Sequence, residues 1–340
     1  MDSNKYEKAY IDGSFLITRN LWVATRGKSI DEMNPGDVLK ITIQTLNKLS
    51  KTWGITADKI CLVFDEWDKT LGGYIRTWMI KDYVAYKGSR KFMTEKLLEE
   101  MKSNPNVSQK EIEKAERELA ISKVKFEAKR LMKEEFNKIG IPYFSYPGYE
   151  FDDIVTLASF NGYGKRTKPD VIVTKDTDLT WSLMPDVDFF RLPTNGSDPE
   201  IVTYNDMISL IPQELRDRGM GLYWYHAYCD SLGITGHNDN LKTIKRGRDG
   251  TKAILNIMDG NYEDIENLDA FIAQMKSFNL PTFPNIDKVN KMIEVDFHTK
   301  GHLGTVEEFR DFCQRTKVDG IRDGYYSDFI GRLDQRLYSE

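Results

Sequence analysis

The segment KICLVFD, residues 59–65, is a short apolar run that ends in an acid. Continuous hydrophobic runs of this length are typical of parallel strands that are buried on both faces. Residues 170–178, DVIVTKDTD, repeat this pattern, with a hydrophobic strand followed by acids. Residues 8–24, KAYIDGSFLITRNLWVA, read as a short strand, a turn at an Asp-Gly pair and a helix. GIPYFSYPGYE, residues 140–150, is a fourth candidate strand.

These strands alternate with helical segments, which predicts an α/β fold with a mostly parallel central sheet and helices on both faces. In doubly wound sheets, ligands bind outside the carboxyl ends of the strands. Any single acid there has an ordinary explanation, since Asp is common in the turns that follow strands. We nevertheless expect seven acids to gather at this edge of the sheet: Asp12, Asp65, Glu150, Asp152, Asp153, Asp176 and Asp178.

Three of these acids fall within four positions of YEFDDIVTLASF, residues 149–160, which then turns apolar. Acids in the first turn of a helix are stabilised by its dipole, typically by ~0.3–1 kcal/mol each, so the segment is expected to begin a helix. Carboxylates this close also raise one another's pKa and require a counter-charge. Hard divalent cations provide it, and Mg²⁺ or Mn²⁺ fits oxygen ligands where zinc, in the absence of His and Cys spacing, does not.

The composition is that of a globular protein, with 340 residues of which 40% are hydrophobic and 12% aromatic. No apolar run approaches the ~20 residues that span a bilayer, and the N-terminus MDSNKYEKAYIDG lacks the apolar region of a secretory signal. Cys61, Cys229 and Cys313 stand far apart without metal or redox spacing, which indicates a reducing compartment. We expect a cytoplasmic protein with no membrane partner. The net charge of −5 counts against nucleic acid on average, but acids pooled at a metal site leave the remaining surface more basic.

A long charged segment, residues 85–138, separates the second strand from the third. Both of its halves have helical periodicity, with a polar break at NPNVSQ, and their mixed charge is typical of a solvated helical hairpin. The segment YKGSRK near its start places Lys87, Arg90 and Lys91 soon after the second acidic strand. Cations beside a carboxylate cluster suit a phosphate, so a phosphate-handling role stands beside the solvated hairpin.

After residue 200 the sequence changes to a strand-to-helix passage at IVTYNDMISLI and then to two helical segments within residues 221–258. A Gly- and Lys/Arg-rich turn joins those two segments, and Asp230 and Asp239 lie in the same stretch. A glycine turn before a helix start is a natural backbone-amide cradle for phosphate, while an ordinary helix-turn-helix packing unit is the alternative. Residues 260–340 have a polar, helical pattern that indicates no particular chemistry.

In chain order these blocks resemble the structure-specific 5′ nucleases, which include bacteriophage 5′–3′ exonucleases and flap endonucleases and the 5′ nuclease domain of bacterial DNA polymerase I. YIDGSFLITRNLWVA resembles the first acidic block of that family and CLVFD the second. IRTWMIKDYVAYKGSRK resembles its basic block, YEFDDIV its Glu-x-Asp-Asp block and VTKDTDL its Asp-x-Asp block. Each is weak alone, but five in the family's order, within a match over residues 8–258, make a strong signal.

The resemblance implies a 5′ nuclease, PIN-like fold in which residues 1–199 form a nuclease core and residues 85–138 a helical arch that a single strand threads. Residues 200–340 are then a helix–three-turn–helix region and a helical C-terminal part, packed on the core as one compact unit. The pair Asp239-Asn240 matches that module after a spacer longer than usual. The residues expected to bind nucleic acid are Lys91, Lys245, Arg246, Gly247, Gly250 and Lys252.

The chemistry that the resemblance implies uses two Mg²⁺ or Mn²⁺ ions roughly 3.5–4 Å apart on the cleaved phosphate. Asp65, Glu150 and Asp152 are assigned to one ion, and Asp176, Asp178 and Asp239 to the other. Asp12, Asp153 and Asp230 are expected to act directly or through water. The catalytic cations are Lys87, Arg90 and Arg76, with Lys87 and Arg90 stabilising the charge that builds on the phosphate.

The implied function is that of a magnesium-dependent 5′–3′ exonuclease or flap endonuclease acting in DNA replication or repair. Its substrates are DNA with 5′ ends, flaps or junctions, extending to RNA primers in an RNA–DNA hybrid. We expect a monomer that works beside replication proteins, in the cytoplasm of the host if the source is a bacteriophage. Two alternatives stay open, namely an inactive DNA-binding relative and a carboxylate–metal phosphohydrolase acting on small substrates.

Overall fold

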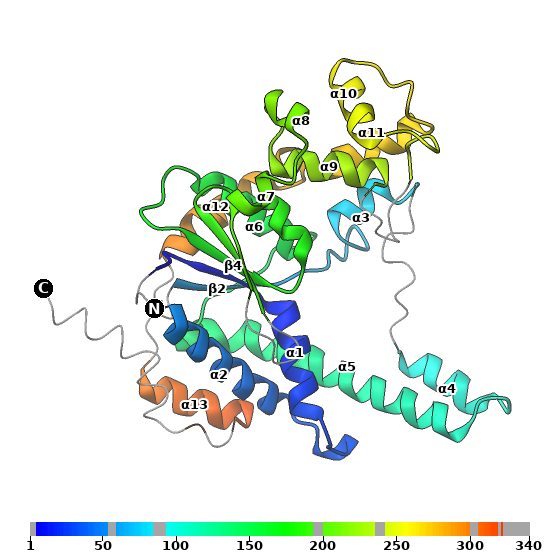
Figure 1. Cartoon of the computed structure of the whole chain (residues 1–340). Helices are drawn as coiled ribbons and strands as arrows, with labels where there is room; N and C mark the ends of the chain where they lie inside the picture. Colours follow the sequence, from blue (N-terminus) through cyan, green and yellow to red (C-terminus); the bar gives the residue numbers. More distant parts are fainter. Residues whose placement is uncertain are drawn as a thin grey trace, which may run out of the picture. The chain divides into compact units, whose positions relative to one another are not determined.

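Six strands form a mixed sheet in the order β3-β2-β1-β4-β5-β6, flanked by helices (Figure 1). The computed structural model describes residues 5–53, 59–83, 93–192, 200–234, 242–299, 305–318 and 321. Their contacts cluster into two units. The first unit comprises residues 1–64, 91–144 and 299–340, and the second comprises residues 65–90 and 145–298. The α/β fold with a mostly parallel sheet is confirmed, and the expected domain boundary at residue 199 stays a prediction.

The strands of the first unit are β1 (Ala9–Asp12), β2 (Ile60–Val63) and β3 (Tyr143–Phe144), and they pair in parallel. β2 lies in the middle of the three and all four of its residues are buried, as the apolar run predicts. The strand expected within residues 140–150 is only two residues long, since β3 pairs with β2 through Leu62 and Val63 alone.

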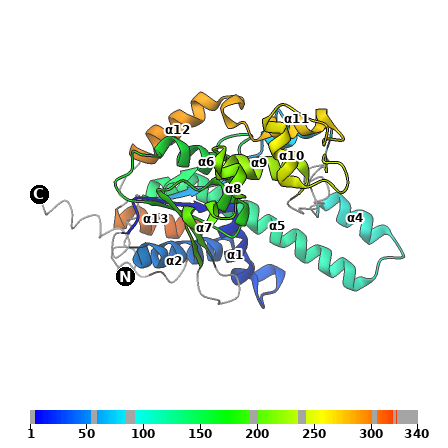
Figure 2. The ribbon, with the colours of Figure 1, turned by 45° about the horizontal axis from the view of Figure 1, so that its top comes forward.

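The helices of the first unit are α1 (Gly13–Thr25), α2 (Pro35–Trp53), α4 (Glu95–Ser103), α5 (Gln109–Glu135) and α13 (Val306–Thr316), with short 3-10 helices η1 (Ile30–Glu32) and η3 (Phe136–Ile139). α1, α2 and α5 contact one another, and α4 folds back on α5 as a hairpin (Figures 1 and 2). The helical halves and the polar break predicted within residues 85–138 are therefore confirmed. Their role as an arch stays a prediction.

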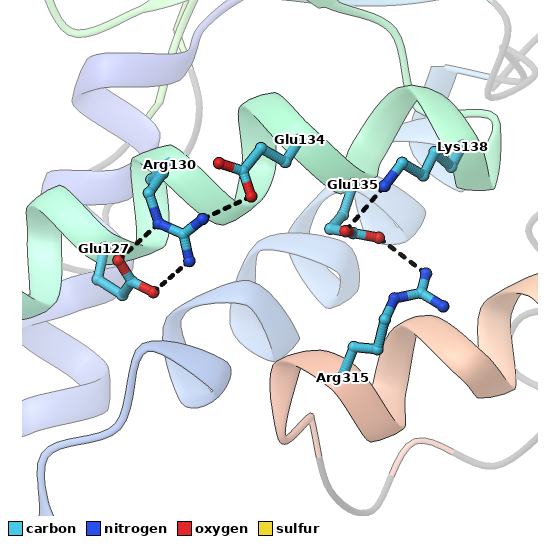
Figure 3. Close-up of polar contacts among 6 residues, drawn as sticks. All are labelled: Glu127, Arg130, Glu134, Glu135, Lys138 and Arg315. Carbon is cyan, nitrogen blue, oxygen red and sulfur yellow. Dashed lines mark hydrogen bonds and ion pairs between the residues drawn. The ribbon is translucent and has the colours of Figure 1, made fainter.

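Charge patterning explains why α5 tolerates solvent along much of its length. Arg130 bonds both Glu127 and Glu134, one helical turn away on each side, and all three side chains are partly exposed (Figure 3). Pairs at these spacings stabilise isolated helices by roughly 0.2–0.5 kcal/mol each. The buried face of α5 is carried by small and flexible apolar residues, among them Ala128 and Met132.

The second unit contains β4 (Asp170–Thr174) and β5 (Val187–Arg191), which pair in parallel, and β6 (Glu200–Val202), which pairs with β5 in the antiparallel direction. β4 is buried along its whole length and leads to the 3-10 helix η4 (Thr177–Ser182). The helices are α3 (Ile75–Ile80), α6 (Phe151–Gly162), α7 (Tyr204–Ile208), α8 (Gln213–Asp217), α9 (Leu222–Leu232), α10 (Gly250–Met258), α11 (Leu268–Ser277) and α12 (Ile286–Thr299), with η5 (Leu280–Thr282). α11 packs against both α3 and α9. Within the described ranges, no helix combines the length and apolar composition that crossing a membrane requires.

Candidate active site

The start of α6 is built from acids that serve the helix and one another. Glu150 is the N-cap residue in a capping-box arrangement with Asp153, whose Oδ2 accepts from the Glu150 amide at 3.0 Å. This bond gives a partner to the backbone amide at the start of the helix. Asp65, two residues after β2, accepts from the Phe151 amide at 2.8 Å. Asp65 and the acidic helix start are therefore brought together, as the sequence predicts.

Arg76 projects from α3 onto this helix start. Its Nε donates to Asp153 Oδ1 at 2.6 Å, and the Asp153 side chain is fully buried. Burial alone lowers the pKa of the Arg76 guanidinium, but the neighbouring groups Asp153, Tyr223, Asp152 and Glu150 together outweigh it and the net pKa is raised. The ring of Phe278 lies 5.2 Å from the guanidinium carbon. Arg76 was expected to be catalytic, and the structure places it in a buried ion pair with one of the expected metal ligands.

The surroundings of the Asp152 carboxylate disfavour its charged form, which a nearby cation would stabilise. Burial raises its pKa well above the ordinary value, and the charges of Asp176 and Glu150 raise it further. Arg76 opposes this effect, and Asp65 adds to it. Three carboxylates, from three separate segments of the second unit, therefore act on that of Asp152. Repulsion of this kind is a common mark of a functional site.

Asp176 and Asp178 follow β4 as predicted. Asp176 caps η4, and its Oδ1 accepts from the Asp178 amide at 3.1 Å. Its own amide donates to the Thr174 hydroxyl at 3.2 Å. The chain therefore turns sharply at the end of the strand, which keeps both acids close to it.

The remaining expected metal ligands are carried by other elements or fall outside the described residues. Asp12 ends β1 in the first unit and caps α1 by accepting from the Phe15 amide at 2.8 Å. Asp230 lies on α9, where its Oδ2 accepts from Nε2 of Gln274 on α11 at 3.1 Å. Asp239 falls outside the described residues, as do the expected cations Lys87, Arg90 and Lys91. Across the described part of the chain, no three Asp, Glu, His or Cys side chains lie close enough to share one metal ion.

The glycine turn leads into α10, as the pattern indicates. Gly247 adopts a left-handed backbone (φ 79°), and Gly250 is the first residue of the helix. Asp249 caps that helix by accepting from the Lys252 amide at 2.8 Å. A hollow of about 380 Å³ adjoins the turn, lined by Gly247, Arg248, Asp249, Lys252, Asn256, Glu263 and Asp264. Lys245 donates to the Glu263 carbonyl, Arg246 is exposed, and the role of this turn in binding nucleic acid stays a prediction.

Sequence reasoning missed the residues that hold the site's side chains in place. Tyr223 on α9 donates its hydroxyl to the Phe278 carbonyl at 2.7 Å and acts electrostatically on Arg76. Gln274 holds Asp230. Neither residue type carries a local signal, because Tyr and Gln are ordinary on helices and their partners are far away in the sequence.

The fold and the acidic strand ends together define a chain that is similar to structure-specific 5′ nucleases. The flap endonuclease of bacteriophage T5, solved with DNA and metal ions, has 16% identity and a TM-score of 0.44, over 96% of this chain and 99% of that one. The catalytic core of Rad2 with a DNA substrate has 16% identity and a TM-score of 0.43, over 97% and 93%. Human GEN1 with Holliday junction DNA has 12% identity and a TM-score of 0.43, over 95% and 70%.

No protein-family model matches the chain, and no curated protein matches it.

Proposed function

We propose that this protein is a divalent-metal-dependent nuclease that hydrolyses phosphodiester bonds in 5′-ended, flapped or branched DNA. One observation carries the proposal: the carboxylate of Asp152 is repelled by Asp176, Glu150 and Asp65, which come from three different segments. A chain gains nothing in stability from such repulsion, so a cationic ligand is the natural reason to keep it.

The donor set suits a hard cation. Mg²⁺ needs no cage of three or four protein ligands, because it usually keeps several waters and takes one or two carboxylates together with substrate phosphate. When bound, Mg²⁺ or Mn²⁺ ions would supply the charge that activates water and stabilises the leaving oxygen. The proposed direct ligands are Asp65, Glu150 and Asp152 for one ion and Asp176, Asp178 and Asp239 for the other.

The chain's other charged residues take supporting roles in this proposal. Asp153 and Arg76 fix the start of α6, and through it the direction in which Glu150 and Asp152 point. Asp12, Asp153 and Asp230 act on the metal ions directly or through water. Lys87 and Arg90 stabilise the charge on the phosphate as it is transferred. Lys91 and the glycine turn before α10 hold the DNA backbone, with Lys245, Arg246, Gly247, Gly250 and Lys252.

The finer parts of the proposal concern biology. We propose a role in DNA replication or repair, as a cytoplasmic monomer that works beside replication proteins, with RNA primers as a further substrate. A small-molecule phosphohydrolase would explain the acids equally well. It would not explain the helical hairpin α4–α5, which exposes many charged side chains, among them Lys96 and Lys114.

The test is a comparison of substrates at one Mg²⁺ concentration. Labelled 5′-flap DNA, linear duplex with a recessed 5′ end and a generic phosphate monoester are incubated with the full chain, with and without EDTA. We expect EDTA-sensitive cleavage of the flap at the junction and no turnover of the monoester. Turnover of the monoester alone would favour the small-molecule enzyme, and DNA binding without cleavage would favour the inactive relative.

A further inference from the structure

The segment directly after Asp65 presents exposed aromatic rings to solvent. Trp67 is 56% exposed and Trp78, on α3, is 43% exposed. The ring of Tyr74 joins them, with its centroid 5.6 Å from that of Trp67 in an edge-to-face arrangement. Lys81 places its Nζ 5.5 Å from the centroid of the Trp78 ring. We refer to Trp67, Tyr74, Trp78 and Lys81 as the aromatic surface.

The backbone under the aromatic surface is tied to the acidic helix start. The Glu66 carbonyl accepts from the Gly148 amide at 2.8 Å, and the Glu66 amide donates to the Tyr149 carbonyl at 3.1 Å. These two bonds hold the residue before Trp67 against the residues that immediately precede Glu150. The Ile75 amide donates to the Gly148 carbonyl at 2.8 Å, which fixes the start of α3 in the same way. The backbone that carries the rings is therefore bonded to the segment that leads into the proposed site of cleavage.

The turn that follows Trp67 is closed by backbone hydrogen bonds. The amides and carbonyls of Asp68 and Gly73 bond one another at 3.1 and 3.2 Å and close the turn. Asp68 Oδ1 accepts from the Thr70 and Leu71 amides, so its carboxylate is engaged by the backbone of the turn. The exposed charges that remain in this stretch are Lys69 at the turn, Lys81 on the Trp78 ring and Asp82. Cations next to rings suit a ligand with both phosphates and flat bases.

We propose that the aromatic surface stacks unpaired bases of the DNA strand next to the cleaved phosphate. The proposal rests on the nuclease function proposed above and adds to it a preference for substrates that are single-stranded at that point. Stacking of a base on an aromatic side chain is tolerant of sequence because every base has a π-face. The surface therefore selects for strand separation without reading the bases.

A mutant cycle between protein and DNA tests the contact. Binding of labelled flap DNA is measured by anisotropy without divalent metal, using strands in which one base at a time is removed and its phosphate kept. Stacking is worth ~1–3 kcal/mol per base, so removal of the stacked base should weaken binding by the native chain about 5- to 150-fold. The same removal should cost the Trp78→Ala or Trp67→Ala variant less than about twofold, because the partner ring is already gone. Trp78→Phe should restore part of the effect.

The matched control is Trp22→Ala. Trp22 is 63% exposed on α1 and carries Arg26 with its guanidinium carbon 5.1 Å from the ring centroid, so it offers the same chemistry on a helix that is not part of the aromatic surface. Trp22→Ala should leave the base-removal profile unchanged. If base removal and Trp→Ala substitutions act independently at every position, stacking is ruled out while flap cleavage still stands. If the native chain neither binds nor cleaves flap DNA, the nuclease proposal fails as well.

Discussion

Arg76 Nε lies 2.6 Å from Asp153 Oδ1, and this ion pair sits under the helix start that carries Glu150 and Asp152. The Asp153 side chain is fully buried and that of Arg76 is 17% exposed. The pair neutralises one of the acids of YEFDDIV from inside the protein. The sequence places all three acids in one cluster and cannot tell which of them already has a partner.

Removal of Arg76 should therefore damage the fold before it damages chemistry. Arg76→Ala leaves Asp153 charged and buried, and breaking a buried pair in this way typically costs ~3–5 kcal/mol. The free energy of unfolding in urea measures the loss. Arg218→Ala is the control, since Arg218 pairs with Asp259 on the surface and such pairs contribute ~0–1 kcal/mol. Equal and small losses in the two variants would mean that Arg76 is not a structural partner of Asp153.

The buried ring of Phe64 leaves no room for a side chain at position 13, which is occupied by Gly13. A Cβ at Gly13 would lie 2.3 Å from Cζ of Phe64, whose ring is fully buried and stacked on Tyr143 at a centroid distance of 4.3 Å. Overpacking of this kind typically costs ~1–3 kcal/mol, so Gly13→Ala should lower the midpoint of urea unfolding. Gly221→Ala is the control, because nothing lies within 4 Å of a Cβ there. A normal midpoint for Gly13→Ala would show that the Phe64 ring can move aside.

Stability at acid pH should report on the contact between α5 and α13. Arg315 donates to Glu135 at 2.8 Å, and Lys138 donates to the same carboxylate at 2.9 Å (Figure 3). Burial alone raises the pKa of Glu135, but the hydrogen bonds from Arg315 and Lys138 and the charges of these two residues together outweigh it, and the net pKa is lowered. A lowered folded pKa gives stability that is present above the unfolded pKa and lost as the pH falls through the folded one.

Arg315→Ala should accordingly cost about 1 kcal/mol at pH 7, and this difference from the native chain should shrink toward zero as the pH falls below the ordinary Glu pKa of 4.5. Urea unfolding of both chains at several pH values measures it. Lys114→Ala, on the exposed face of the same helix, should show a small cost throughout. A cost for Arg315→Ala that stays constant into acid would mean that Glu135 is not its partner.

Much of the fold follows from short-range patterns. The apolar runs at β1, β2 and β4 end in acids because strands buried on both faces stop where polar groups can reach solvent, and the start of α6 is visible in its capping acids. The polar break between α4 and α5 could also be predicted, since Ser108 begins a capping box with Glu111. β3 was expected to be longer because the extent of a strand depends on its partner, which the local sequence does not contain.

For a related reason, only part of the site could be predicted from the sequence. Which acids are near one another follows from the topology of a parallel sheet, but which of them are already paired depends on contacts between distant residues. Arg76 and Asp153 are 77 positions apart, and Gln274 and Asp230 are 44 apart. Neither pair leaves a pattern in a single sequence. The expected cations Lys87 and Arg90 rest on the motif alone.

A substitution of Lys87 therefore tests the catalytic role that the sequence motif alone assigns to this residue. If Lys87 contacts the cleaved phosphate, Lys87→Ala should lower single-turnover cleavage by ~10²-fold or more, the scale of one lost transition-state donor. DNA affinity should fall far less, because many cations share the backbone. Lys96→Ala, whose side chain is 88% exposed on α4, should change neither quantity. Equal, small effects of the two substitutions on the rate would reduce the basic block to a solvated segment.

Asp152→Asn tests the central claim most directly, by single-turnover cleavage of 5′-flap DNA in Mg²⁺ beside equilibrium binding of the same DNA. The nuclease proposal predicts that the rate falls by ~10²-fold or more while binding is retained, and that the thermal midpoint without metal rises because repulsion from Asp176, Glu150 and Asp65 is relieved. Asp217→Asn, an acid on α8 bonded to Gln213, should leave rate and midpoint unchanged. Cleavage by Asp152→Asn at close to the native rate would contradict the assignment of these carboxylates to a catalytic metal site.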